Sequence, residues 1–343
     1  MNNKLLKQSY NECHKIFKKN AKTYYFGALL FDYEKFLHVC AFYGLVRVVD
    51  DFVDIENNTE NLEKNIILKK KKIYEFEESF FNLIDKINNK NKLYDPNILW
   101  EKYHFIMPAV INTTYTIGIN KELYKKFFKS MKMDLENFNY MNYQKLEEYM
   151  DGSAAIIGEV MLKIISYKNN NTIYSLQDMT KYARSLGIAF QLTNFIRDIN
   201  EDNNMFPSRQ YIPITDQLIY NSIITNDTII KNNNNFKNLI EFQLKRCDGI
   251  YKIADIGISK IDNKNKDPIL IAKILYSSIN KKIRNNNYDI QKKIYISKIE
   301  KFNIIYKVLG LRKFMILFPK LTYNYITYNL IFNKIYNKNA NIF

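Results

Sequence analysis

The chain has 343 residues, of which 47% are hydrophobic and 15% aromatic, so it can bury the core of one large domain or of two ordinary ones. Nine Gly and six Pro are too few for a β-sandwich or a Gly-rich nucleotide-binding fold, and this scarcity favours long helices. The formal net charge of +16 sits largely in Asn/Lys-rich stretches that are typical of solvated loops; attraction to acidic membrane headgroups is the alternative, and no basic-aromatic module indicates nucleic-acid binding.

Helix-like periodicity runs through most of the chain. It predicts helices over residues 10–19, 21–30, 33–55, 62–88, 100–118, 123–135, 146–167, 178–201, 239–261 and 268–283, with a weaker one over 290–306. The Asn-rich stretch 231–235 is expected to be a loop. No linker divides the chain, so we expect one all-α domain, a single helical bundle over residues 1–308, followed by a C-terminal helical appendage over 309–343.

Both ends of the sequence bear on location. The first residues lack the apolar run of a signal peptide and the Ser/Arg bias of a transit peptide, and the three scattered cysteines fit a reducing compartment, so we expect a cytoplasmic location. Residues 302–336 are apolar and aromatic but interrupted by Lys and Arg, so no stretch reaches the ~20 apolar residues of a membrane span. We expect either an interfacial or a core-packing helix pair there, and the interfacial alternative would make the protein peripheral to a membrane.

The first of two carboxylate clusters lies near the end of the helix expected over 33–55. At 100° per residue, Arg47, Asp50, Asp51 and Asp54 fall within an arc of about 100°, and apolar residues occupy most of the remaining circumference. Like charges on one face repel, and burying them is costly unless a cation lies between them. A surface helix with local ion pairs is the alternative to a binding site.

The second cluster begins in the helix expected over 178–201. Gln191, Asn194, Asp198 and Asp202 share one stripe within about 100°, in a setting of small and apolar residues. If these side chains face inward, their polar atoms would lack hydrogen-bond partners unless a metal or a substrate is bound. A polar network in the core is the alternative. Hard oxygen ligands with no His or Cys nearby suit Mg²⁺, which bridges carboxylates to substrate phosphates. The two clusters together therefore indicate an enzyme that acts on a diphosphate.

The segments around these clusters resemble the squalene/phytoene synthase family, the head-to-head prenyl synthases. The matching stretches lie in order between about residues 10 and 305: 21–27, Tyr43 with 47–54, 133–135, 149–159, 186–202, 208–213 and 275–276. The resemblance implies the isoprenoid synthase fold, an all-α bundle with a central cavity that binds two prenyl diphosphates. Asp151 departs from the family pattern, which usually has Tyr or Arg there, and adds negative charge near the expected mouth of the cavity.

The resemblance also implies roles for single residues. The metal ligands would be Asp50, Asp54, Asn194 and Asp198, with Mg²⁺ bound and Mn²⁺ as an alternative ion. The residues that bind diphosphate or order the substrate would be Lys22, Thr23, Tyr24, Arg47, Asp51, Gln191, Arg197 and Arg209. The catalytic residues of the reaction region would be Tyr43, Tyr149, Tyr276 and Asp202. Aromatic faces among them would stabilise an allylic carbocation, which also needs a dry pocket.

The second motif, Gln191–Asp198, and the run Gly152–Ala155 are more similar to phytoene synthases than to squalene synthases. We therefore expect a prenyltransferase of carotenoid biosynthesis that joins two geranylgeranyl diphosphates head to head into phytoene, through a cyclopropyl diphosphate and without NADPH. A squalene or dehydrosqualene synthase that uses farnesyl diphosphate is the alternative. A non-catalytic relative serving as a membrane assembly factor would be expected to lose one Asp cluster, and this chain keeps both. No nucleic-acid partner is expected.

Overall fold

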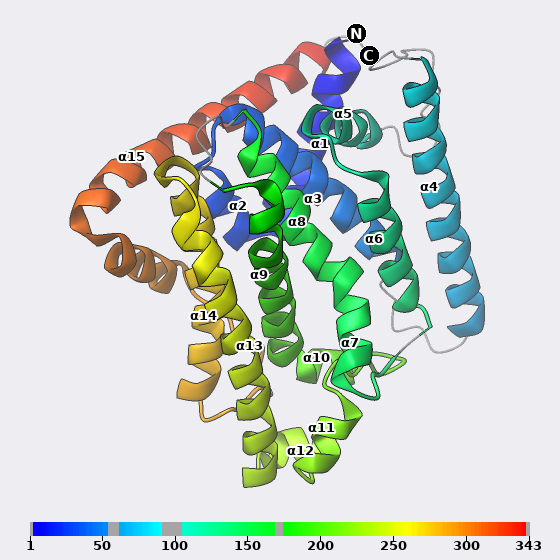
Figure 1. Cartoon of the computed structure of the whole chain (residues 1–343), viewed down its shortest axis with the longest axis vertical. Helices are drawn as coiled ribbons and strands as arrows, with labels where there is room; N and C mark the ends of the chain where they lie inside the picture. Colours follow the sequence, from blue (N-terminus) through cyan, green and yellow to red (C-terminus); the bar gives the residue numbers. More distant parts are fainter. Residues whose placement is uncertain (1–2, 54–61, 91–104, 137, 169–173, 341–343) are drawn as a thin grey trace.

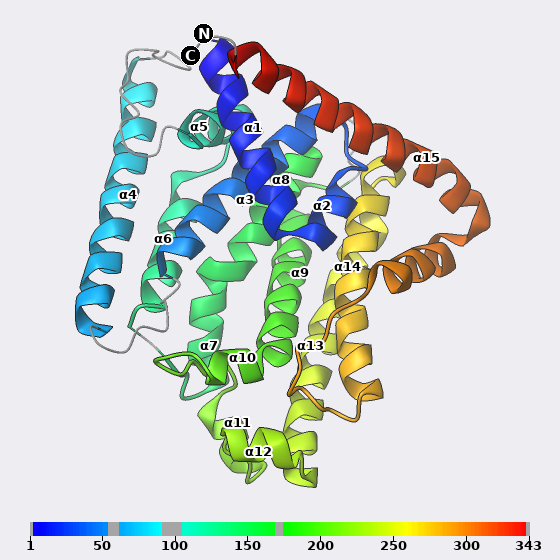
Figure 2. The same ribbon diagram turned by 180° about the vertical axis from the view of Figure 1, so that it is seen from behind.

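The computed structural model describes residues 3–53, 62–90, 105–136, 138–168 and 174–340, and these form helices and no β-strand (Figures 1 and 2). The expected all-α class is therefore confirmed. The beginning of the first helix and the end of the last one lie side by side in both views, so the two ends of the described chain meet at one corner of the bundle.

The helices follow one another in three groups. The first comprises α1 (Asn3–Asn20), α2 (Lys22–Ala28), α3 (Tyr33–Val53), α4 (Leu62–Lys90), α5 (Met107–Ile117) and α6 (Lys121–Met133). The second comprises α7 (Tyr143–Met150), a π-helical turn (η2, Asp151–Ala155), α8 (Ile156–Ser166), α9 (Leu176–Arg197) and α10 (Ile199–Asn203). The third comprises α11 (Ile214–Ile219), α12 (Asn226–Lys231), α13 (Asn234–Lys260), α14 (Asn263–Asn285) and α15 (Lys298–Ala340).

The helix expected over 146–167 is interrupted by the π-helical turn. Gly152 lies there so close to α6 that an added Cβ would be 2.2 Å from the backbone oxygen of Lys126. A π-helical turn widens a helix locally, and such turns occur often at functional sites. The turn therefore lets the backbone approach α6 closely while α8 continues along the bundle.

Other boundaries also differ from the sequence expectation; among them, one loop is shorter and two helices start later. The loop expected over 231–235 shrinks because α13 already begins at Asn234, capped by a side-chain hydrogen bond of Asn233. Helix α15 begins at Lys298 and not at residue 290, and helix α5 begins at Met107 and not at residue 100. Residues 91–104 lie outside the described part of the chain.

Helices α8 and α9 run side by side through the middle of the bundle, with their backbones nearly in contact (Figure 1). A Cβ added at Gly158 of α8 would lie 2.0 Å from the backbone oxygen of Ala183, and one added at Gly187 of α9 would lie 2.2 Å from that of Ala154, in the π-helical turn that leads into α8. Only glycine fits at these two crossings. The close approach leaves no side-chain layer between the two helices there, and it fixes α9 as the central element on which the candidate site is built.

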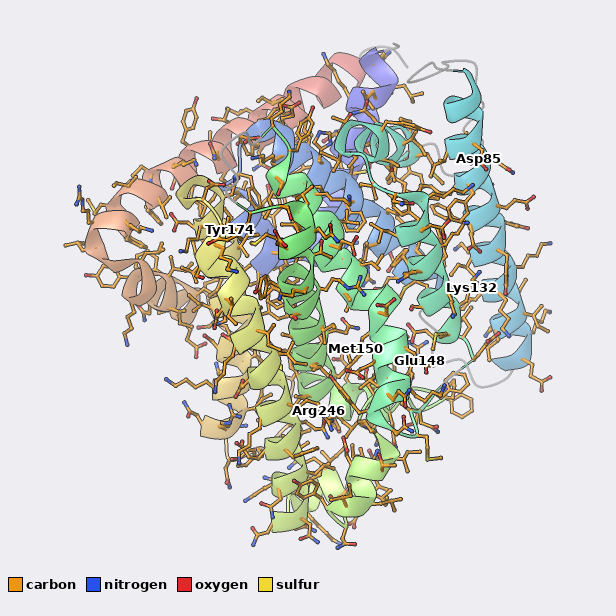
Figure 3. The ribbon with its side chains drawn as sticks, viewed as in Figure 1. Asp85, Lys132, Glu148, Met150, Tyr174 and Arg246 are labelled. Atoms are coloured by element: carbon orange, nitrogen blue, oxygen red, sulfur yellow. The ribbon has the colours of Figure 1, made fainter. Side chains whose placement is uncertain are left out.

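Helix α4 packs along the outside of α6. Lys132 Nζ lies 2.8 Å from the Glu77 carboxylate and Lys121 Nζ lies 2.7 Å from that of Asp85; Lys132 and Asp85 are labelled in Figure 3. Partly exposed ion pairs of this kind contribute at most about 1 kcal/mol each. The fully buried ring of Phe80 therefore does more to hold α4 in place.

Helix α15 has 43 residues and a kink at Gly310, where φ is 69° and ψ is 164°. This region of backbone conformation is essentially restricted to glycine, so Gly310 is what permits the change of direction. The kink lies two residues after 308, the expected end of the main domain. Within the described part of the chain, no helix is both long and apolar enough to cross a membrane.

The half of α15 that follows the kink is fixed to the N-terminal helices. The Asn324 side chain donates a hydrogen bond to the Leu29 backbone oxygen at 2.6 Å, and the Tyr328 hydroxyl donates one to the Phe31 backbone oxygen at 3.0 Å. The ring of Phe332 is fully buried. The last part of the chain is thus built into the bundle on one of its faces.

His14 is a buried base that should make stability depend on pH. Its Nε2 lies 2.9 Å from the Tyr25 hydroxyl and its ring stacks on Phe332 at 4.1 Å. Burial, with the charges of Lys18 and Lys15, lowers the pKa of His14 from 6.5 to about 4. The unfolded chain therefore binds this proton more readily, so the stabilisation is complete above pH ~6.5 and is lost as the pH falls towards 4.

We expect neutral His14 to account for about 2 to 3 kcal/mol of lost stability between pH 7 and pH 4.5. The measurement is urea unfolding of the wild type and of His14→Phe, which keeps a ring against Phe332, at both pH values. The difference in unfolding free energy between the two proteins should change by that amount. A difference that does not depend on pH would contradict the assignment.

Candidate active site

An apolar cavity of about 310 Å³ runs along α9 in the centre of the bundle. Its wall on α9 is made by residues three and four apart that share one helix face: Met179, Tyr182, Ala183, Leu186, Gly187, Phe190, Gln191 and Asn194. Helices α1, α2, α3, α8, α13 and α14 and the π-helical turn supply most of the rest. From Asn194 to Met179 the helix rises by about 22 Å. The α9 wall is polar at its Asn194 end and apolar towards Met179, which suits a ligand with a polar head and a long apolar tail.

The first carboxylate cluster lies on the last turns of α3. Arg47 Nη1 lies 2.9 Å from Asp50 Oδ2, and the same guanidinium also pairs with Asp51. Asp54, the remaining member of the predicted cluster, lies outside the described residues. One turn before Arg47, Tyr43 lines the cavity, and burial raises the pKa of Tyr43 to about 12, so its hydroxyl stays neutral.

The second cluster lies where α9 ends. Gln191 and Asn194 line the cavity, and the side-chain oxygen of Asn194 is buried with no hydrogen-bond partner among the described residues. At Asp198 φ is −99° and ψ is 7°, so the helix ends there and does not run unbroken to residue 201 as expected. Arg197 Nε donates a hydrogen bond to Asp198 Oδ1 at 2.8 Å. The side chains of adjacent residues point in different directions on a regular helix. The pairing of Arg197 with Asp198 is therefore possible because the helix ends here.

Lys293 brings a further cation to this cluster. Its Nζ lies 3.3 Å from Asp198 Oδ1 and also pairs with Glu201. Lys293 lies in the irregular segment before α15, where the sequence predicts helix. Helical periodicity carries no signal for a contact across 95 residues of chain. Lys293 is thus a site residue that the sequence analysis missed.

Asp202 lies one turn beyond Asp198, on α10. Its backbone N–H donates to the Asp198 backbone oxygen at 2.8 Å, so the turn is kept across the helix break. Burial, reinforced by the charge of Asp198, raises the pKa of Asp202 to about 8, while Arg209 and Lys293 act in the opposite direction. The raised pKa means that the positive charges of Arg209 and Lys293 do not offset the burial of this carboxyl and the negative charge of Asp198.

Arg209 connects the two clusters through its hydrogen bonds. Its guanidinium, only 7% exposed, donates to the backbone oxygens of Val53 at 3.1 Å and of Asp134 at 3.3 Å, and its backbone N–H donates to that of Asp202 at 2.9 Å. Val53 is the last residue of α3 and adjoins Asp54. One buried side chain thus ties the end of the first motif to the second.

Aromatic rings form the wall beside the second cluster. Tyr24 stacks on Tyr276 with ring centres 4.6 Å apart, and Phe190 lies 5.4 Å from the first and 4.7 Å from the second. Tyr24 and Phe190 line the cavity, whereas Tyr276, which is 9% exposed, is outside the set of lining residues. Burial raises the pKa of Tyr24 well above 10, so its ring remains a neutral π system. Phe190 was not among the predicted site residues, although its spacing from Gln191 and Asn194 places it on the same helix.

Tyr149 lies outside the set of residues that line the cavity. Its hydroxyl donates to Asp134 Oδ2 at 2.7 Å, and that of Tyr211 donates to Asp134 Oδ1 at 3.2 Å. The Tyr211 ring stacks on Phe195 of α9 at 4.1 Å. Since Arg209 also bonds to Asp134, this cluster supports the junction of the two motifs. The direct catalytic role expected of Tyr149 stays a prediction.

Two lysines meet at the start of α2. Lys301 Nζ donates a hydrogen bond to Thr23 Oγ1 at 2.7 Å. Burial, with the positive charge of Lys22, lowers the pKa of Lys301. An anion would stabilise these two like charges, and diphosphate would supply one. The structure therefore brings Lys301 to Lys22 and Thr23, although it follows Thr23 by 278 residues in the sequence.

Asp151, the departure from the family pattern, does not add free negative charge. It pairs with Arg184, and Lys126 Nζ lies 3.1 Å from its Oδ2. Arg184 also lies 3.0 Å from Glu159. The two cations offset the carboxylate, so the expected effect at the cavity mouth is largely cancelled.

The described residues fit Mg²⁺ through oxygen donors. Asn194 Oδ1 is buried and without a partner in the described part, and the Asp198 carboxylate lies one turn further on. No three His, Cys, Asp or Glu side chains among the described residues converge as a metal site by themselves. Mg²⁺ is usually held by one or two carboxylates and completed by water and substrate phosphates, so a cage made by protein alone is not required. The metal assignment stays a prediction.

Comparisons with known proteins agree with this geometry. A family model described as squalene/phytoene synthase matches residues 17–300. The chloroplast phytoene synthase of an Oncidium hybrid cultivar is 25% identical over 306 residues, which cover 87% of this chain and 66% of that protein. The 15-cis-phytoene synthase of Synechococcus elongatus is 23% identical over 309 residues, covering 85% and 89% respectively. The chain thus spans just under two thirds of the plant protein and most of the cyanobacterial one.

The solved structures define the class of fold. A dehydrosqualene synthase in complex with a ligand superposes with a TM-score of 0.69 at 20% identity, covering 88% of this chain and 96% of the other. The fold is therefore the all-α isoprenoid synthase fold, as expected. This fold and the family-model match over residues 17–300 together show that the chain belongs to the squalene/phytoene synthase family. Members of this family are prenyltransferases. The resemblance seen in the sequence is confirmed.

Proposed function

We propose that this protein is a phytoene synthase, which joins two geranylgeranyl diphosphates head to head into a C40 hydrocarbon. Relatives named phytoene synthase support the reaction class. The length of the cavity is the observation that carries the choice of substrate, because the two alternatives, farnesyl and geranylgeranyl diphosphate, differ in the length of their tails.

The tail lengths can be compared with the wall of α9. A fully extended chain advances by about 1.2 Å per bond, as the extended peptide backbone does, so a farnesyl tail measures ~14 Å and a geranylgeranyl tail ~19 Å. The lining residues Asn194 and Met179 are about 22 Å apart along the helix. A C20 tail would fill most of this length, whereas a C15 tail would leave the far end empty, and unfilled apolar space forfeits packing contacts.

The polar end of the cavity would hold and release diphosphate. Arg47, Arg197 and Lys293 place positive charge at the two carboxylate clusters, where charge-assisted hydrogen bonds to phosphate oxygens form. Bound Mg²⁺, for which Asn194, Asp198 and Asp50 are the described candidate ligands, would act as a Lewis acid that stabilises the departing diphosphate. Lys22 and Lys301 would hold a second diphosphate near Thr23.

Departure of the first diphosphate leaves an allylic carbocation in the apolar part of the site. The faces of Tyr24 and Phe190 line this part and can stabilise positive charge, while an apolar lining that excludes water would protect the cation. The double bond of the second substrate attacks the cation, and loss of a proton closes a cyclopropyl diphosphate. A second ionisation, rearrangement and proton loss give phytoene, so that two diphosphates and two protons leave and no hydride donor is consumed.

Product analysis tests the proposal directly. Purified protein is incubated with Mg²⁺ and either geranylgeranyl or farnesyl diphosphate, with and without NADPH, and the hydrocarbon is identified by mass. We expect a C40 product that is independent of NADPH and is lost when EDTA removes the metal. A C30 product formed from farnesyl diphosphate in preference would assign the protein to squalene or dehydrosqualene synthesis, and no product from either substrate would overturn the proposal.

A further inference from the structure

The outward face of α15 after its kink is an exposed apolar stripe. It consists of Leu311, Met315, Ile316, Tyr323, Ile326 and Leu330, whose exposed fractions are 62%, 64%, 63%, 67%, 52% and 53%. At 100° per residue they span an arc of about 140°, and the centre of this arc is opposite the buried residues Leu321, Asn324, Tyr328 and Phe332. From residue 311 to 330 the stripe is about 29 Å long. It is therefore a continuous ridge rather than scattered apolar residues.

Charge is almost absent from this part of the helix. Between residues 314 and 333 the only charged residue is Lys320, and its Nζ donates a hydrogen bond to the Leu30 backbone oxygen at 3.0 Å. The charged end of Lys320 is therefore bonded to the body of the protein, although the residue as a whole is exposed. A solvent-facing helix surface normally carries charged residues, so the reversal of that pattern here calls for a covering partner.

Two further aromatic side chains are partly exposed on the first arm of α15 and pack against the inner side of the second arm. Phe302 and Tyr306, on the first arm of α15, lie 4.9 Å and 5.5 Å from Phe314 on the second, and they are 46% and 41% exposed. Figures 1 and 2 show α15 along one edge of the molecule with its elbow projecting away from the bundle, and side chains at the elbow extend outward in Figure 3. The apolar surface is thus at a convex, accessible edge.

Exposed cations lie at the end where the stripe begins, and one of them, Arg312, falls within its arc. Lys307 and Arg312 are exposed on either side of Gly310, while Lys313 is paired with Asp267 at 3.0 Å. Along the stripe, Lys18 of α1 lies over the ring of Tyr325, 5.2 Å from its centre. An apolar helix face with Tyr and basic residues at its margins is the pattern of a helix that lies in the plane of a membrane interface.

Charge distinguishes a bilayer from a second copy of this chain. Each copy carries a formal net charge of +16, so two copies repel one another, whereas an anionic lipid surface attracts the protein. We propose that α15 from Leu311 to Leu330 docks in the interface of an anionic bilayer, with the stripe immersed and Lys307 and Arg312 at the headgroups. The family match ends at residue 300, so this surface lies outside the matched region, and the inference does not depend on the proposed reaction.

Vesicle flotation with matched variants tests the proposal. The double variant Ile316→Asp with Ile326→Asp places two charges on the stripe. Its control, Ile219→Asp with Ile230→Asp, changes the same residue type at exposed fractions of 71% and 63% on α11 and α12, at the opposite end of the molecule (Figure 1). We expect the wild type and the control to float with phosphatidylglycerol vesicles, and the stripe variant to bind at least tenfold more weakly. Circular dichroism should be the same for all three.

A labelling experiment provides a second measurement that needs no charged substitution. The three native cysteines are buried, so an introduced Met315→Cys can be labelled selectively with a polarity-sensitive dye, with Ile230→Cys as the control. Anionic vesicles should shift the emission of the first label to the blue and leave the second unchanged. Absence of wild-type binding, or equal behaviour of the two double variants, would overturn the proposal. So would a dimer that only the stripe variant dissociates, because the partner would then be a second copy.

Discussion

Asp198→Asn should lower kcat/KM by at least about 100-fold and leave the helical content unchanged. The substitution keeps the volume of the side chain but removes the negative charge that pairs with Arg197 and Lys293 at the end of α9. The Asp198 side chain is 17% exposed, so this charge acts in a region where solvent screens it only partly. In the proposed reaction, diphosphate departure would depend on the positive charge that this carboxylate orders, whether through a metal ion or through the two cations.

The control is Asp227→Asn on α12, which removes a carboxylate that pairs with Lys231 at 66% exposure, far from the cavity. It should keep turnover within about twofold, because exposed pairs of this kind contribute little. Turnover is measured at increasing Mg²⁺ concentrations for both variants. If Asp198 holds the metal, the apparent Mg²⁺ affinity of the first variant falls together with its activity. Activity of Asp198→Asn within threefold of the wild type would refute both the metal assignment and the charge argument.

The part of the site that lies along one helix could be predicted from the sequence. Gln191 and Asn194 share a face of α9 because of helical periodicity alone, and the structure places both on the cavity. The continuation to Asp198 and Asp202 was less secure, since it assumed an unbroken helix. The helix ends at Asp198, where a pairing between sequence neighbours replaces the regular geometry. Periodicity predicts which residues share a face only as far as the helix extends.

Contacts between distant segments could not be predicted in the same way. Lys293 reaches Asp198 from an irregular segment, and Arg209 reaches Val53 from a loop, so neither contact follows from local spacing. The prediction for the C-terminal residues 302–336 was limited in the same way. The apolar residues there are compatible with a buried pair of helices or with an interfacial one, and only the bend at Gly310 decides which of them face outward. Such decisions depend on tertiary packing, for which a single sequence carries little signal.

Ala183→Phe should change the preferred substrate from geranylgeranyl to farnesyl diphosphate. Ala183 lines the cavity on α9, eleven residues and therefore about 16 Å from Asn194. A ring placed there would leave room for a tail of ~14 Å but not for one of ~19 Å. We expect turnover of geranylgeranyl diphosphate to fall at least tenfold, because insertion of extra volume into a packed apolar space is costly. Turnover of farnesyl diphosphate should stay the same or rise, with a C30 product.

The matched control is Ser185→Phe, on the same helix but outside the set that lines the cavity. It introduces the same ring two residues away, so it separates an effect on cavity length from an effect on the stability of α9. Products are quantified by mass for the wild type and both variants, at equal concentrations of the two diphosphates. Retained preference for the longer substrate in Ala183→Phe would show that the tail does not run along α9. An equal loss in both variants would show a general disturbance of the helix. A selective loss of the C40 product in Ala183→Phe alone is the result expected if α9 measures the length of the substrate, since the ring blocks only what extends beyond residue 183.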